Sequence, residues 1–78
     1  MRKVKINGVY KHFKGDLYIV EDIGYDSETC DKVVIYRALY GEHKLWVRPY
    51  SSFIEEVNKN KCKYRFTEIK MNSVRKEN

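Results

Sequence analysis

Apolar and polar residues alternate over short stretches of the chain, a pattern typical of half-buried β-strands. Alternation over residues 9–13 predicts a first strand, and β-branched and aromatic residues over 17–23 predict a second. The segment Lys14-Gly15-Asp16 between them predicts a turn, because glycine tolerates positive φ and aspartate bonds nearby backbone. A polar stretch over 24–31 then predicts a loop.

Residues 32–40 carry the strongest strand signal, because apolar side chains occupy both alternating sets of positions. This pattern suits a central strand that is covered on both faces. Gly41 opens a short hairpin loop over residues 41–44, and the chain returns as a strand over 45–48. Pro49 has no backbone N–H and is expected to end that strand.

The last third of the chain combines a short helix signal with one further strand. Ser52 and Glu55 have the spacing of a capping box, which predicts one or two helical turns from Ser52 to about Val57. A polar loop over 58–63 and an alternating strand over 64–69 follow.

Together these elements predict an all-β fold: a small, partly open five-stranded barrel with one short helical turn before the last strand. The pattern alone does not separate an SH3-like barrel from an OB-like barrel. We expect a basic N-terminal arm over residues 1–7, a single domain over 8–69 and a frayed C-terminal tail over 70–78.

The length of 78 residues allows one domain at most. No apolar run approaches the roughly 20 residues that cross a membrane, and no apolar segment of a secretory signal follows the basic N-terminus. Two cysteines are fewer than small secreted, disulfide-stapled folds carry. We therefore expect reduced thiols and a cytoplasmic protein.

The net charge of +5 is unevenly distributed along the chain. Residues 1–14 contain five basic side chains and no acidic one, whereas residues 15–31 contain six acidic side chains and no basic one. A nucleic-acid-binding protein needs a continuous basic face, so such a partner requires the acidic segment to lie elsewhere on the surface.

Several motifs in a fixed order resemble a known family. They are Gly8-x-Tyr10-x-His12-Phe13-Lys14-Gly15-x-x-Tyr18, Ser27-Glu28-Thr29, Val33-Val34-x-Tyr36-Arg37-x-Leu39-Tyr40-Gly41, Trp46-Val47-Arg48-Pro49, Phe53 and Arg65-Phe66. Over residues 8–69 the chain resembles a family of small bacterial proteins known only as a domain of unknown function. The resemblance implies an SH3-type barrel and no established activity. Asp26 and Tyr64 stand where the family usually has His and Pro, so the resemblance implies no role for an imidazole beside Ser27.

The polar string Asp26-Ser27-Glu28-Thr29 is the first candidate for a functional site. As a ligand loop, it offers carboxylate and hydroxyl groups at the rim of a barrel. The alternative is a structural turn in which Ser27 and Thr29 bond the backbone. An enzymatic role for this loop requires its groups to lie near His12 or Arg48.

Arg37, Trp46 and Arg48 form the second candidate, with Tyr40 and Tyr50 nearby in the sequence. The two guanidinium groups offer paired N–H donors to a phosphate or carboxylate, and the indole offers a stacking surface.

Strand parity places Trp46 outside if Leu45 and Val47 fill the core. In the alternative, Trp46 is a core residue and Arg48 pairs with Glu28 or another acid. The sequence also leaves open whether its seven tyrosines pack in the interior or form a binding face.

Metal binding and catalysis have weaker signals. His12, Cys30, His43 and Cys62 lack the spacing of zinc ligands, so we predict no metal and no cofactor. The nucleophile and base types among the candidates are Ser27, Cys30, His12 and His43, but none lies in a nucleophile elbow. The sequence therefore favours a role without catalysis.

We therefore predict a binding module that holds an anionic or peptide-like partner, with nucleic acid as one option. The predicted binding residues are His12, Lys14, Ser27, Glu28, Thr29, Arg37, Trp46, Arg48 and Tyr50. The alternatives are a small enzyme or accessory subunit that uses the 26–29 loop, and a purely structural or homo-oligomeric protein.

Overall fold

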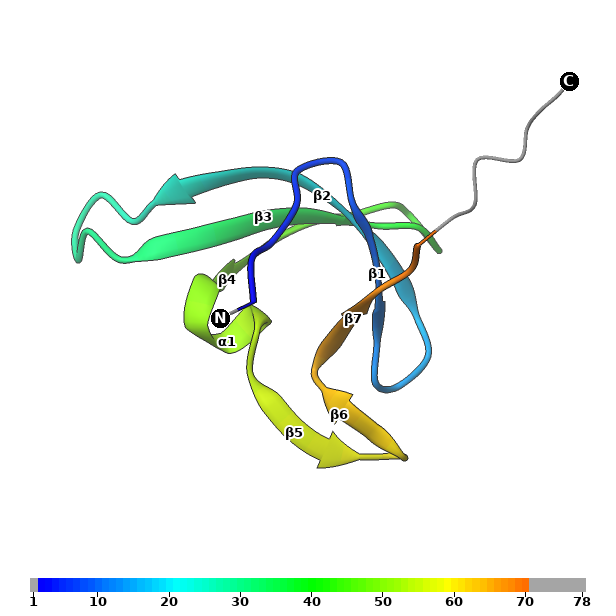
Figure 1. The fold of residues 1–78 in the computed structure, drawn as a ribbon. Helices are drawn as coiled ribbons and strands as arrows, with labels where there is room; N and C mark the ends of the chain where they lie inside the picture. Colours follow the sequence, from blue (N-terminus) through cyan, green and yellow to red (C-terminus); the bar gives the residue numbers. More distant parts are fainter. Residues whose placement is uncertain (1, 71–78) are drawn as a thin grey trace, which may run out of the picture.

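The computed structural model describes residues 2–70 and arranges them around a curved antiparallel sheet (Figure 1). The elements in chain order are β1 (Val9–His12), β2 (Leu17–Tyr25), β3 (Lys32–Ala38), β4 (Leu45–Pro49), α1 (Tyr50–Phe53), β5 (Glu56–Lys59), β6 (Cys62–Tyr64) and β7 (Phe66–Glu68). The sheet has the order β4-β3-β2-β1-β7, and β5 and β6 form a separate two-stranded hairpin.

The predicted fold class is confirmed: the chain is mostly β, its five-stranded sheet is not closed, and one short helix precedes the last strands. Within residues 2–70, β4 and β7 are the two edges of this sheet. The grouping with SH3-type barrels, which rests on the resemblance, stays a prediction. No helix within these residues is long and apolar enough to cross a membrane.

The prediction of a capping box was wrong, and the helix begins earlier than expected. Helix α1 starts at Tyr50, directly after Pro49, and no side chain caps it. The hydroxyl of Ser52 instead accepts a hydrogen bond from Arg48, and the carboxylate of Glu55 pairs with Arg65. The Ser52 hydroxyl and the Glu55 carboxylate therefore bond arginine side chains and not the start of the helix. These contacts override the local sequence signal.

The polar stretch over 58–63 was also predicted wrongly as a loop. It contains most of the β5–β6 hairpin, because Asn58, Asn60 and Lys61 adopt positive φ angles that let the chain reverse tightly. Asparagine visits this region more readily than most residues, so the two asparagines were the signal for the turn.

One face of the sheet carries the core. Along β3, Val34, Tyr36 and Ala38 are buried, while Val33 and Ile35 on the other face are only half-buried. The expectation that this strand is covered on both faces was therefore wrong. Within residues 2–70, Phe53 and Val4 pack on the inner face, and the outer-face side chains of β3 keep part of their surface exposed.

Aromatic rings dominate that core. Phe53 of α1 stacks on Phe66 of β7 with ring centroids 4.1 Å apart, and Tyr10 and Tyr36 meet Phe53 edge-on. The fully buried valines Val20 and Val34, together with Val4, complete the cluster. Because Phe53 belongs to the helix and Phe66 to the last strand of the sheet, this stack joins the helix to the sheet.

Residues 2–7 pack against the rest of the domain. The Arg2 guanidinium donates to the carbonyls of Ile54 and Phe66, and the Val4 N–H donates to the Tyr50 hydroxyl. A side chain at Gly8 would lie 2.9 Å from the Lys5 carbonyl, so the turn that joins this segment to β1 requires glycine. The division at residue 8 stays a prediction, and residues 71–78 of the expected tail lie outside the described residues.

Removing one ring of the stack tests its importance. We expect Phe66→Ala to lower the free energy of unfolding by about 3–5 kcal/mol, because it leaves a cavity against Phe53. Urea denaturation followed by circular dichroism measures this change. Leu45→Ala is the matched control, since Leu45 is exposed and its truncation should change stability by about 0.5 kcal/mol or less. Equal effects of the two substitutions would contradict the assigned core.

Candidate functional site

Strand register brings several polar and aromatic side chains to the inner face of the sheet. Residues that are directly opposite on neighbouring strands point to the same side. Tyr36 lies opposite Trp46, Tyr18 opposite Ala38, and His12 opposite Phe66. Tyr36, Ala38 and Phe66 are buried, so Trp46, Tyr18 and His12 continue the same face beyond the core.

Tyrosine rings extend the core toward the β3–β4 hairpin. Tyr18 contacts Tyr36, Tyr40 and Phe66 edge-on, at centroid distances of 5.3–5.6 Å. The hydroxyls of Tyr18 and Tyr40 are 2.7 Å apart and share a hydrogen bond. Burial, and then this hydrogen bond, raise the pKa of Tyr18 above its ordinary value. The hydrogen bond between the two hydroxyls therefore fixes the position of the Tyr40 ring.

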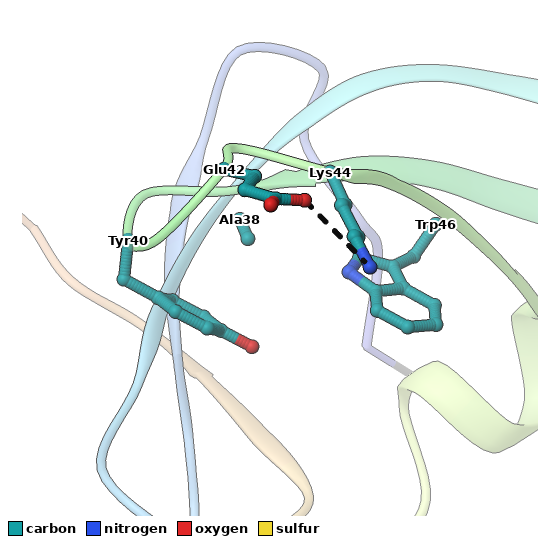
Figure 2. Close-up of a pocket in the computed structure, with 5 residues that line it drawn as sticks. All are labelled: Ala38, Tyr40, Glu42, Lys44 and Trp46. Carbon is teal, nitrogen blue, oxygen red and sulfur yellow. Dashed lines mark ion pairs between the residues drawn. The ribbon is translucent and has the colours of Figure 1, made fainter.

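A pocket of about 330 Å³ lies beyond Tyr40 (Figure 2). Its residues are Ala38, Tyr40, Glu42, Lys44 and Trp46. Tyr40 and Trp46 are 42% and 46% exposed and stand on either side of Ala38, which is buried. The small alanine between two large rings creates the hollow. Glu42 and Lys44 approach to 3.9 Å at its rim, and both are largely exposed.

The turn that joins β3 to β4 shapes this pocket. Gly41 and His43 both adopt positive φ, and the His43 ring nitrogen Nδ1 lies 3.2 Å from the Ala38 carbonyl. The Ala38 N–H donates to the Lys44 carbonyl, which aligns the first residues of the returning strand. Tyr40 and Trp46 are thereby held on the same side of the hairpin.

Arg48 places a fixed positive charge beside this aromatic face. Its Nε donates to the Tyr36 hydroxyl at 3.2 Å, and its Nη1 donates to the Ser52 hydroxyl at 3.0 Å. The guanidinium carbon is 5.8 Å from the centre of the Phe66 ring. The suggested pair between Arg48 and Glu28 was therefore wrong, because the Arg48 side chain is directed to these groups of the inner face.

His12 lies next to the same cationic region. Its ring meets Phe66 edge-on at 5.0 Å, and its Nδ1 accepts a hydrogen bond from the Lys14 N–H. Burial, followed by the charges of Arg48, Arg65 and Lys14, lowers the pKa of His12. The imidazole is thus neutral at pH 7 and acts as a hydrogen-bond acceptor that ends the β1–β2 turn.

Arg37, Tyr50 and Lys14 do not join this face. Arg37 points to the outer face, where it pairs with Glu21 at 3.0 Å and donates to a carbonyl. The Tyr50 hydroxyl accepts from the N-terminal segment, and a lysine ammonium lies 4.6 Å from its ring centre. The Lys14 ammonium lies 6.0 Å from the ring of its neighbour Phe13.

Ser27, Glu28 and Thr29 lie at the far end of the β2–β3 hairpin (Figure 1). The carboxylate of Asp26 accepts from the N–H groups of Glu28 and Thr29, and these bonds lower the pKa of Asp26. The Thr29 hydroxyl accepts from a further backbone N–H. The string is thus a structural turn, in which Asp26 rather than Ser27 bonds the backbone together with Thr29.

This turn is also far from the pocket. β2 runs from Leu17, near His12, to Tyr25, next to the turn. At a rise of about 3.3 Å per residue, that strand separates the two ends by on the order of 20 Å. Ser27 thus lies beyond one end of β2, and His12 lies near the other end.

Sequence reasoning missed three pocket residues, Ala38, Glu42 and Lys44, and named Tyr40 only as a neighbour of the candidate. The sequence signal for this pocket was strand parity. Residues 36, 38 and 40 share one face, and residues 44, 46 and 48 of the neighbouring strand lie on that same face. The exposed position of Trp46 was anticipated for the wrong reason. Leu45 and Val47 do not fill the core, since they are 49% and 63% exposed on an edge strand.

Comparison with known proteins identifies the family. Residues 8–68 match the family model described as "Protein of unknown function (DUF1653)". The chain belongs to the DUF1653 family. A crystal structure of a DUF1653 protein from Bordetella bronchiseptica superposes with a TM-score of 0.74 at 28% identity, covering 88% of this chain and 92% of that one. No curated protein matches the chain in sequence.

Much of the motif string in this DUF1653 chain has a structural explanation. Gly8 permits a close backbone approach, Tyr10 and Phe66 are core rings, and Arg48 binds Tyr36. Trp46 differs, because it is nearly half exposed and neither fills the core nor ends an element. Its place on this DUF1653 fold is therefore not explained by packing.

The lowered pKa of His12 predicts a pH effect on stability. The unfolded DUF1653 chain binds a proton at His12 more readily than the folded chain, so the neutral imidazole stabilises the fold above about pH 6.5. That stabilisation is lost as the pH falls below this value. We expect the free energy of unfolding to fall more steeply between about pH 7.5 and about pH 5.5 in the wild type than in His12→Asn.

Urea denaturation at the two pH values measures this difference. Asparagine offers an oxygen in place of Nδ1, so His12→Asn keeps an acceptor for the Lys14 N–H. His43→Asn retains His12 and is the matched control for exchanging a histidine for an asparagine. Identical pH profiles of wild type and His12→Asn would contradict the assigned environment.

Proposed function

We propose that this domain is a binding module that holds an anionic, peptide-like segment against the face formed by Tyr40, Trp46 and Arg48. The observation that carries the proposal is the pocket between the exposed rings of Tyr40 and Trp46. Tyrosine and tryptophan provide rigid contact area at low entropic cost and are enriched at interfaces. Arg48 adds a positioned cation on the same face.

The separation of the aromatic pocket from the lysine-lined groove favours a peptide over a nucleic acid. Proteins that hold single-stranded nucleic acids combine stacking rings with a basic groove along one path. Here a second groove is lined by Lys11, Lys61 and Lys63, among others. Lys11 neighbours the buried Tyr10 along β1 and so points to the outer face, away from Trp46. The lysine groove and the aromatic pocket therefore do not form one continuous path for a single strand of nucleic acid.

The geometry also supports binding over catalysis by the 26–29 loop. The Asp26 carboxylate and the Thr29 hydroxyl bond their own turn, which follows the end of β2 that is far from His12. Catalytic groups must reach a common atom, and these groups do not. The cytoplasmic location inferred from the sequence stays a prediction.

Trp46 provides a direct test, because it is the single tryptophan of the chain and lies in the pocket. We expect its fluorescence to change on titration with acidic peptides and the dissociation constant to rise with added salt. Tyr40→Ala removes one side of the pocket but keeps the reporter. This substitution should weaken binding by about tenfold or more.

Tyr25→Ala is the matched control. Tyr25 is 71% exposed at the other end of the β2–β3 hairpin, so its loss should leave the affinity unchanged. Oligonucleotides serve as the competing ligand class. If neither peptides nor oligonucleotides change the Trp46 signal, or if both tyrosine variants weaken binding equally, the proposed site is wrong.

A further inference from the structure

Strand β4 leaves an open backbone edge beside the pocket. It pairs with β3 on one side and, within residues 2–70, with no strand on the other. The Ala38 N–H donates to the Lys44 carbonyl, so the bonded pairs along this ladder continue at Trp46 and Arg48. The intervening residues Leu45 and Val47 therefore direct their N–H and C=O groups outward.

This edge is unusual in its side chains. Leu45, Trp46 and Val47 are three consecutive large apolar residues, and each is about half exposed or more. Natural proteins usually protect open edges with charges, prolines or bulges. Here Pro49 and the turn at His43 limit the length of the edge, but its centre is unprotected.

We propose that an acidic, extended segment of a partner protein binds by adding a strand antiparallel to β4, with one side chain in the pocket beside Trp46. This inference rests on the proposed function and names the partner class and the mode of binding. Main-chain bonds to Leu45 and Val47 would hold the segment, as in other proteins that bind peptides by strand addition.

The register of such a strand defines its side chains. Residues opposite Lys44, Trp46 and Arg48 would lie on the inner face, next to one apolar and two basic groups. Residues opposite Leu45 and Val47 would lie on the outer face against apolar side chains. The complementary sequence is acidic, β-branched, aromatic, β-branched, acidic.

The charges along β4 support this occupant. Lys44 is 66% exposed, and its 3.9 Å contact with Glu42, itself 83% exposed, is too weakly held to keep it from a partner. Arg48 uses Nε and Nη1 within the domain, which leaves Nη2 without a hydrogen-bond partner among residues 2–70. A carboxylate at either end of the segment therefore meets a cation.

A second copy of the chain fits this edge less well. The two-fold antiparallel pairing that uses both Leu45 and Val47 places Lys44 opposite Arg48 twice. Like charges directly opposite one another destabilise a strand pair. The same edge therefore disfavours its own copy and favours an acidic partner.

The test uses capped synthetic peptides and Trp46 fluorescence with the full chain. We expect Gly-Glu-Val-Phe-Val-Glu-Gly to bind and the charge-reversed Gly-Lys-Val-Phe-Val-Lys-Gly to bind about tenfold or more weakly. N-methylation of both valines blocks the amides that face Leu45 and Val47, and should weaken binding by about tenfold or more. N-methylation of the phenylalanine is the matched control, since that amide points away from β4, and should change the affinity by about twofold or less.

A variant of the protein tests the main-chain hydrogen bonds to the peptide from the side of β4. Val47→Pro removes an N–H that the sheet itself does not use, and should weaken the unmodified peptide about tenfold, whereas Val47→Thr should not. If Val47→Pro does not fold, the N-methylated peptides still decide the question.

The outcomes separate the two proposals. Equal affinity of the valine-methylated and phenylalanine-methylated peptides overturns strand addition but leaves the binding module intact. Tyr40-dependent binding of oligonucleotides without peptide binding overturns strand addition and the peptide-like ligand, and leaves only the location of the binding site. A dimer in light scattering that Val47→Pro dissociates identifies a second copy as the occupant and overturns the acidic partner. No response of Trp46 to any ligand overturns both proposals.

Discussion

The packing of two phenylalanine rings joins the short helix of this small domain to the last strand of its sheet. Phe53 and Phe66 are both 1% exposed and stack nearly parallel, at an interplanar angle of 3°. One comes from a helix of four residues and the other from a strand of three. These short elements bury little surface by themselves, so their position depends on this contact and on the aromatic rings of the sheet that surround it.

The same constraint explains why the inner face carries both the core and the candidate site. A domain of this size buries only about 60–65% of the surface that its unfolded chain exposes. The cover provided by Phe53, Phe66 and Val4 reaches Tyr10, Tyr36 and the central valines. It does not reach the end of the β3–β4 hairpin, where Tyr40 and Trp46 stay exposed.

Tyrosine hydroxyls mark the border between these two regions. Tyr10 and Tyr50 are anchored at their tips by N–H groups of the N-terminal segment, and Tyr36 is anchored by Arg48. Each ring packs inward while its hydroxyl fixes another part of the chain. The hydroxyls of Tyr18 and Tyr40 bond each other instead. This bond orients the Tyr40 ring, which no further element within residues 2–70 covers.

The strands and turns of the sheet follow local signals, and sequence reasoning predicted them. Alternation and the turn at Gly15 were sufficient to predict the β1–β2 hairpin, since both depend on neighbouring residues. The signal at Ser52 failed because Arg48, at the end of the preceding strand, donates a hydrogen bond to its hydroxyl. Likewise Arg37 and Arg48 have the same chemistry, and only the register places them on opposite faces.

Any explanation of the candidate site must also account for the exposed apolar side chains of β4. An apolar edge that served no partner would be a hazard, because unpaired N–H and C=O groups beside leucine, tryptophan and valine invite association with other chains. Two cations, Lys44 and Arg48, flank this edge, and Pro49 ends it. They discourage pairing with an identical strand while leaving the centre open to an acidic one. If β4 binds by strand addition as proposed, the features that disfavour pairing with its own copy are the same features that favour an acidic segment.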